Sequence, residues 1–110
     1  MSADRAANRI KPTQQRALLE QSLAQDWAAR RLHVEYQPQV DLRSRKIVRF
    51  EALLRWRHAE KGIISPKDFI PVAEEMGMIG EIGQWVLEQA CANARSWPED
   101  IGVAVNVSAI

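Results

Sequence analysis

The sequence predicts an α/β fold: a mixed sheet that begins with an antiparallel hairpin and continues through helices into a parallel strand. Residues 32–40 and 101–108 alternate between apolar and polar side chains, as half-buried strands do. The polar link 41–46 is short, so the strand 47–56 must return antiparallel to the first strand. Some forty residues with helical patterns separate the second strand from the third, which favours a parallel βαβ unit.

Composition places the chain among ordinary soluble proteins. Its 110 residues are enough for one domain with a modest core, burying about two-thirds of the unfolded surface. The chain is 46% hydrophobic and 26% charged. A formal net charge of +1 is too small to argue for nucleic acid or an anionic membrane as a partner.

Two absences in the sequence bear on location. No apolar run approaches the roughly 20 residues that span a bilayer, so we expect no membrane segment. The first ten residues lack the apolar core of a signal peptide, so we expect a cytoplasmic protein. The single cysteine, Cys91, has no internal disulfide partner, and we expect a packed thiol within a helix.

The amino-terminal part is predicted to be a leader followed by a helix. Residues 1–12 are polar or small, as expected of a flexible leader or the remnant of a linker. A helix is predicted from Thr13 to about residue 31, because Leu19, Leu23 and Trp27 recur every four residues and form one apolar stripe.

Two further helices are predicted between the second and third strands. After a polar loop at 57–64, Ser65 is a helix cap, with Pro66 at the first helical position. Gly77 offers a natural stop for this short helix. A longer helix is predicted over 79–96, followed by the strand 101–108.

The stretch 50–56 carries the strongest indication of a site. As a strand it places Glu51, Leu53 and Arg55 on one face and only apolar side chains on the other. Burying an ionised group without a partner is costly. Glu51 and Arg55 therefore either meet ions or polar groups at the end of a sheet, or form a plain structural ion pair or a solvated edge.

Several motifs in the right order resemble the opening half of an EAL domain: residues 36–38 (YQP), 51–56 (EALLRW), 68–75 (DFIPVAEE), 83–87 (GQWVL) and 105–109 (VNVSA). EAL domains are phosphodiesterases that open the bacterial second messenger cyclic di-GMP to linear pGpG. The resemblance implies a partial TIM-like barrel whose first strand runs antiparallel and whose later βα units are parallel. Whole barrels need about 250 residues, so we expect residues 13–110 to be a truncated, N-terminal portion of the domain.

The resemblance also implies roles for individual residues. Glu51 is similar to a metal-ligating carboxylate, and Asn106 to a second ligand that supplies its amide oxygen. Such oxygen donors suit Mg²⁺ or Mn²⁺. Arg55 and Gln37 match residues that hold cyclic di-GMP. Leu53, on the same strand face between Glu51 and Arg55, is expected to contact the ligand. Two alternatives stay open: Gln37 as a strand cap, and Asn106 as a hydrogen-bonded core amide.

Other ligands of the family, including a paired aspartate motif, a lysine and another glutamate, come after the position of Asn106. One carboxylate and one amide cannot hold two ions about 4 Å apart, so we expect this chain alone to be inactive. The alternative is a non-catalytic module that binds cyclic di-GMP weakly or self-associates through exposed strand edges. An inert relic is a third possibility.

Overall fold

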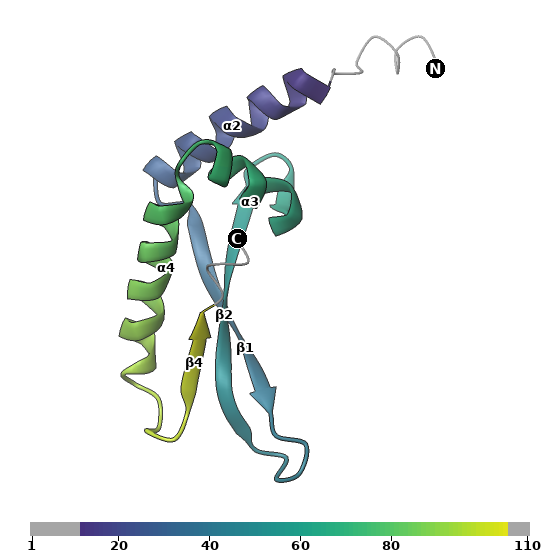
Figure 1. Ribbon diagram of the computed structural model, residues 1–110. Helices are drawn as coiled ribbons and strands as arrows, with labels where there is room; N and C mark the ends of the chain where they lie inside the picture. The colour runs from purple at the N-terminus through teal and green to yellow at the C-terminus, as the bar shows by residue number, and fades with distance from the viewer. Residues whose placement is uncertain (1–11, 106–110) are drawn as a thin grey trace.

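The computed structural model describes residues 12–105, which form a four-stranded sheet and three helices (Figure 1). In chain order the elements are α2 (Pro12–Ala28), β1 (Leu32–Val40), β2 (Ile47–His58), β3 (Gly62–Ile64), α3 (Pro66–Glu75), α4 (Ile79–Ala94) and β4 (Gly102–Val105). No helix within this range is long and apolar enough to cross a membrane.

Strand β2 is the centre of the sheet. It pairs antiparallel with β1 along almost its whole length and parallel with β4 from Arg49, opposite Gly102, to Ala52, opposite Val105. This confirms the predicted hairpin followed by a parallel crossover. The crossover contains the short strand β3 and the helices α3 and α4, with α4 beside the sheet in Figure 1.

The strand β3 was not predicted from the sequence; it lies in the predicted polar loop 57–64. This three-residue strand pairs antiparallel with the end of β2. The turn before it is held by His58, whose Nδ1 accepts hydrogen bonds from the backbone N–H groups of Glu60 and Lys61, both at 3.1 Å. Gly62 has a φ of 74°, which favours glycine. A strand this short has too few residues to display alternation.

The helix ends follow local signals in the sequence. The Ser65 side chain accepts a hydrogen bond from the backbone N–H of Lys67 at 3.3 Å, which confirms the predicted cap of α3. Gly77, with a φ of 70°, follows the end of α3. Helix α2 ends at Ala28 rather than near residue 31, because Arg30 adopts a left-handed φ of 55°.

Helix α4 buries one face and exposes the other. Ile82, Val86 and Ala90 are buried, as their spacing predicts. Cys91 lies in this helix but is exposed, so the expectation of a packed thiol is wrong. One helical residue corresponds to a rotation of about 100°, which carries Cys91 away from the buried stripe that includes Ala90.

The core lies between the helices and one face of the sheet. Ala52, Leu54 and Trp56 of β2 are at most 6% exposed and all belong to this helix-covered face. Trp56 packs edge-on against Phe69 of α3, with ring centroids 5.6 Å apart. Leu54, Trp56 and Phe69 belong to one hydrophobic cluster, whose other members are Leu23, Trp27, Leu32, Val72, Ala73, Ile82 and Val86.

Candidate functional site

The opposite face of the β1–β2 pair carries the polar side chains, and we call it the open face. Cross-strand register brings its residues together in four facing pairs: His33 with Arg55, Glu35 with Leu53, Gln37 with Glu51, and Gln39 with Arg49. Four of the five site residues predicted from the sequence therefore share this face. The fifth, Asn106, lies outside the described residues. Ala104, two positions before it, is the register partner of Glu51.

Glu51 is held by a neighbour that sequence reasoning did not single out. Its Oε2 accepts a hydrogen bond from Nε2 of Gln39 at 3.2 Å. Gln39 in turn accepts a hydrogen bond from Nε of Arg49 through its amide oxygen. The neutral amide separates the Glu51 carboxylate from the Arg49 cation. Glu51 is half-buried, and its orientation is set by β1 rather than by the side chains beside it on β2.

Arg55 pairs with Glu35 of β1, not with Glu51. Its Nε lies 3.6 Å from Oε2 of Glu35, and its Nη1 donates to the carbonyl oxygen of Leu54 at 3.3 Å. The structure thus contains an ion pair at Arg55, but across the hairpin instead of along the strand. The guanidinium is held in place with donor N–H groups to spare, because only two of its nitrogens have these partners.

Glu35 is the centre of a small polar network on the open face. Its Oε1 lies 3.1 Å from Nε2 of His33. The hydrogen bond from His33, followed by the charge of Arg55, holds the pKa of Glu35 below its usual value. Strand alternation places Glu35 on the same face as Gln37, but only the register shows that it reaches Arg55.

The donor atoms of the open face suit a hard divalent cation in part. Glu51 provides a carboxylate, the ligand type that Mg²⁺ and Mn²⁺ favour, and no cation pairs with it among residues 12–105. That same range contains no group of three or more His, Cys, Asp and Glu side chains arranged to hold a metal ion. The described residues fit one ligand of a metal site rather than a whole site.

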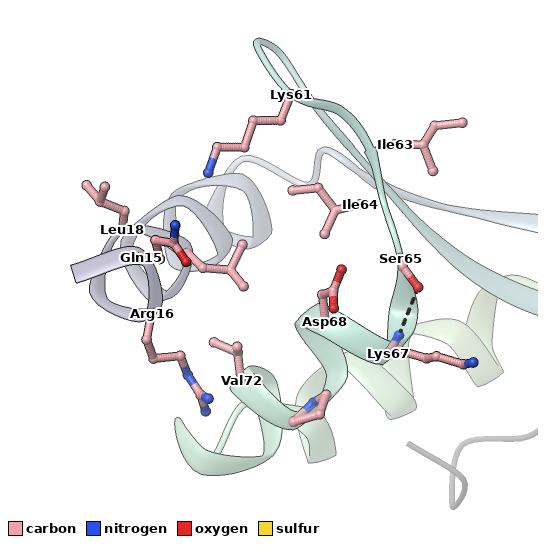
Figure 2. A pocket seen from close by; sticks show the side chains of 12 residues that line it. Gln15, Arg16, Leu18, Lys61, Ile63, Ile64, Ser65, Lys67, Asp68 and Val72 are labelled. Atoms are coloured by element: carbon pink, nitrogen blue, oxygen red, sulfur yellow. Dashed lines mark hydrogen bonds between the residues drawn. The ribbon is translucent and has the colours of Figure 1, made fainter. Parts of the chain in front are cut away.

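A cavity of about 940 Å³ lies away from the open face, between α2, β3 and α3. Figure 2 shows its walls, with Ile64 and Val72 among the apolar residues and Lys61 at the rim. None of the four described site residues, Gln37, Glu51, Leu53 and Arg55, lines it. We therefore place the candidate site on the open face, where the chemically relevant side chains meet, and not in this cavity.

Comparison with known proteins agrees with the motifs. The family model described as "EAL domain" matches residues 20–110. An uncharacterised protein of Sinorhizobium fredii, y4lL, is 48% identical over 109 residues, which cover 98% of this chain and 12% of that protein. MucR of Pseudomonas aeruginosa, a bifunctional diguanylate cyclase/cyclic di-GMP phosphodiesterase, is 41% identical over 101 residues, covering 88% of this chain and 15% of MucR. The chain thus spans a small part of these relatives.

Solved structures show the same relationship. The MucR phosphodiesterase in complex with c-di-GMP superposes with a TM-score of 0.76 at 41% identity, over 81% of this chain and 38% of that one. The EAL enzyme Bd1971 in its cGMP-bound form has a TM-score of 0.70 at 28% identity, over 84% of this chain and 28% of that one. This chain belongs to the EAL domain family, and its α/β structure corresponds to part of the family's TIM-like barrel.

Proposed function

We propose that residues 13–110 are the N-terminal portion of a domain that hydrolyses cyclic di-GMP to pGpG with a divalent metal ion. The observation that carries this proposal is the in-register meeting of Gln37, Glu51, Leu53 and Arg55 on one face of an EAL-family sheet. The names of two relatives support the substrate: MucR, and the cyclic di-GMP phosphodiesterase PA2567 of Pseudomonas aeruginosa.

Arg55 is proposed to bind a phosphate of cyclic di-GMP. A guanidinium presents several N–H donors in a planar fork, which matches the oxygens of a phosphodiester. Glu35 and the carbonyl oxygen of Leu54 fix the fork before the nucleotide arrives, so little side-chain entropy remains to be lost on binding. Gln37 and Leu53 line the same face and supply an amide and an apolar contact.

Glu51 and Asn106 are proposed to hold Mg²⁺ or Mn²⁺. Ala104 is the register partner of Glu51, and the second residue beyond it along a strand returns to the same face. A bound divalent cation supplies a water of lowered pKa and neutralises charge on a phosphate oxygen. In this proposal Gln39 orients the carboxylate of Glu51 through their hydrogen bond, as second ligand shells do in metalloproteins.

We further propose that the 110-residue chain does not hydrolyse cyclic di-GMP on its own. A two-metal site needs carboxylates on several strands. On the open face of β1 and β2 the carboxylates are Glu51 and Glu35, and Glu35 is engaged by Arg55 and His33. Additional strands of the barrel are needed to complete the ligand set.

The test is a chimera in which residues 20–110 replace the matching segment of the MucR phosphodiesterase domain. We expect pGpG formation that depends on Mg²⁺ or Mn²⁺. The substitution Glu51→Gln is expected to lower kcat on the order of 10²–10³-fold, by analogy with the loss of other charge-stabilising groups. Glu88→Gln, on the exposed surface of α4, is the matched control and is expected to leave the rate unchanged.

Two results would contradict the proposal. One is a chimera that binds cyclic di-GMP and metal yet yields no pGpG; the other is full activity of the Glu51→Gln chimera. Activity of the unmodified 110-residue chain would refute only the claim that it is inactive alone.

A non-catalytic module is the second candidate. Arg55 and Gln37 can bind the phosphate and base of cyclic di-GMP without a metal ion. Strand β1 also pairs only with β2 among residues 12–105, which leaves an edge for a second copy. Titration calorimetry with cyclic di-GMP and analytical ultracentrifugation of the chain test both ideas. A monomer that binds no nucleotide contradicts this candidate.

A further inference from the structure

The tip of the β1–β2 hairpin, residues 40–49, gathers exposed apolar side chains. Seven large apolar side chains are exposed among the described residues, and four of them belong to this ten-residue segment: Val40, Leu42, Ile47 and Val48. Leu42 is 91% exposed. Figure 1 shows the hairpin tip projecting at the end of the sheet remote from α2 and α3. Such a cluster indicates an interaction surface.

The hairpin tip is also the most basic part of the chain. It contains four cations, Arg43, Arg45, Lys46 and Arg49, and one carboxylate, Asp41, for a formal net charge of +3. The whole chain carries +1, so all other residues together carry −2. The small net charge therefore hides a strong charge asymmetry. Within the described chain none of the four cations forms an ion pair.

The turn is ordered by hydrogen bonds of Asp41. Its carboxylate accepts from the backbone N–H of Arg43 at 3.4 Å and of Ser44 at 3.3 Å. Its own N–H donates to the carbonyl oxygen of Lys46 at 3.0 Å, and its carbonyl accepts from the N–H of Arg45 at 2.7 Å. The backbone at the hairpin tip is therefore fixed while the side chains of Leu42 and of the three cations of the turn, Arg43, Arg45 and Lys46, are exposed. Little backbone ordering is then needed on docking.

We propose that the hairpin tip docks on the surface of an anionic lipid bilayer. Leu42 and its apolar neighbours enter the boundary between headgroups and acyl chains, while the three cations of the turn contact lipid phosphates. A flat bilayer accepts a projecting tip without a complementary groove. The surface lies at the hairpin turn, and its proposed role does not depend on hydrolysis at the open face.

A nucleic acid explains these residues less well. Basic nucleic-acid sites combine cations with aromatic stacking or with side chains that read base edges. Residues 40–49 contain no aromatic residue, and their four exposed aliphatic side chains gain nothing from a phosphate backbone. Aliphatic side chains do gain free energy on leaving water for a hydrocarbon boundary.

The test measures co-sedimentation of the chain with phosphatidylcholine vesicles, with and without phosphatidylserine. We expect binding only with phosphatidylserine, and weaker binding at high salt. Arg43→Gln and Lys46→Gln should each weaken it about five-fold, and Leu42→Ser about ten-fold or more. The matched controls are Lys67→Gln and Ile63→Ser, an exposed cation and an exposed apolar residue elsewhere, which should bind as the unmodified chain does.

Three outcomes would overturn the proposal. They are no binding to the phosphatidylserine vesicles, equal binding to both vesicle types, and equal losses in the control and hairpin-tip variants. Binding of a DNA or RNA oligonucleotide that is lost in Arg43→Gln and Lys46→Gln but kept in Leu42→Ser would make a nucleic acid the partner instead. Repeating the vesicle measurements with the same variants in the MucR chimera separates docking from any effect on the stability of the chain.

Discussion

At the scale of single residues, Asp26 is the buried polar group that the helix pattern of α2 does not explain. It is 8% exposed, and its Oδ2 accepts a hydrogen bond from the indole Nε1 of Trp56 at 2.7 Å. Arg31 lies 3.5 Å from its other oxygen. The bond joins α2 to the strand that bears Glu51 and Arg55, so Asp26 is a structural residue that supports the open face from behind.

Asp26→Ala should destabilise the chain by about 1–3 kcal/mol, because it leaves a buried indole N–H without a partner. Urea denaturation followed by tryptophan fluorescence measures the change. The double variant with Trp56→Phe should cost less than the sum of the two single changes, since both partners are then removed. Additive losses would show that the bond contributes nothing. Exposed Glu99→Ala is the control.

Glu35 should make the stability of the chain depend on pH. Its pKa is lowered by the hydrogen bond from His33 and by Arg55, from an ordinary value of 4.5. A carboxyl whose pKa is depressed on folding stabilises the fold above its unfolded pKa, and this contribution disappears as pH falls through the lower, folded pKa. The stability difference between the unmodified chain and Glu35→Gln should therefore shrink below about pH 4.5. Urea titrations across that range measure it; a pH-independent difference would contradict the assignment.

At the scale of elements, the two helices of the crossover begin and end at residues whose chemistry explains the boundary. Ser65 supplies a side-chain acceptor for an N–H that the first turn of α3 cannot satisfy, and Pro66 has no N–H to satisfy. Gly77 then adopts the left-handed conformation between α3 and α4. The helix cap at Ser65 and the turn at Gly77 fix the ends of α3, and thereby the positions at which Phe69 and Val72 pack in the core.

Ser65→Ala should cost about 1 kcal/mol, since it removes the cap of α3. Ser65→Gly should cost only a few tenths of a kcal/mol. Urea denaturation midpoints of the two variants give the comparison. Unchanged stability of Ser65→Ala would show that the hydroxyl does not cap the helix.

At the scale of the whole molecule, the sheet has two unlike faces. The helix-covered face carries the hydrophobic cluster, while the open face exposes or half-buries its polar side chains. Stability and proposed chemistry are therefore assigned to opposite faces of the same strand, β2. We therefore expect that site residues can be changed with little effect on folding.

Phe69→Ala, on the covered side, should cost about 3–5 kcal/mol, because it opens a cavity beside Trp56. Leu53→Ala, on the open face, should cost about 1 kcal/mol or less. Urea denaturation of both variants tests the division. Comparable losses at the two positions would mean that the open face is also packed.

Local patterns in the sequence determined the two faces of the central strand, the hairpin and the ends of helix α3. Alternation predicted the two faces of β2, the short link predicted the hairpin, and Ser65 and Gly77 predicted the limits of α3. These features depend on the spacing of side chains along the chain and on backbone preferences. A short stretch of sequence is therefore enough to predict each of them. The motifs also predicted the family correctly. The functional roles of Gln37, Glu51, Leu53, Arg55 and Asn106 stay predictions.

Only the tertiary structure decided which side chains meet. Arg55 pairs with Glu35 rather than Glu51, and Trp56 bonds to Asp26, because strand register and helix packing bring residues of distant sequence position together. The exposure of Cys91 and of the apolar side chains at the hairpin tip also depends on which surfaces other elements cover. Burial and partnership are properties of pairs of segments, so a pattern within one segment leaves them undetermined.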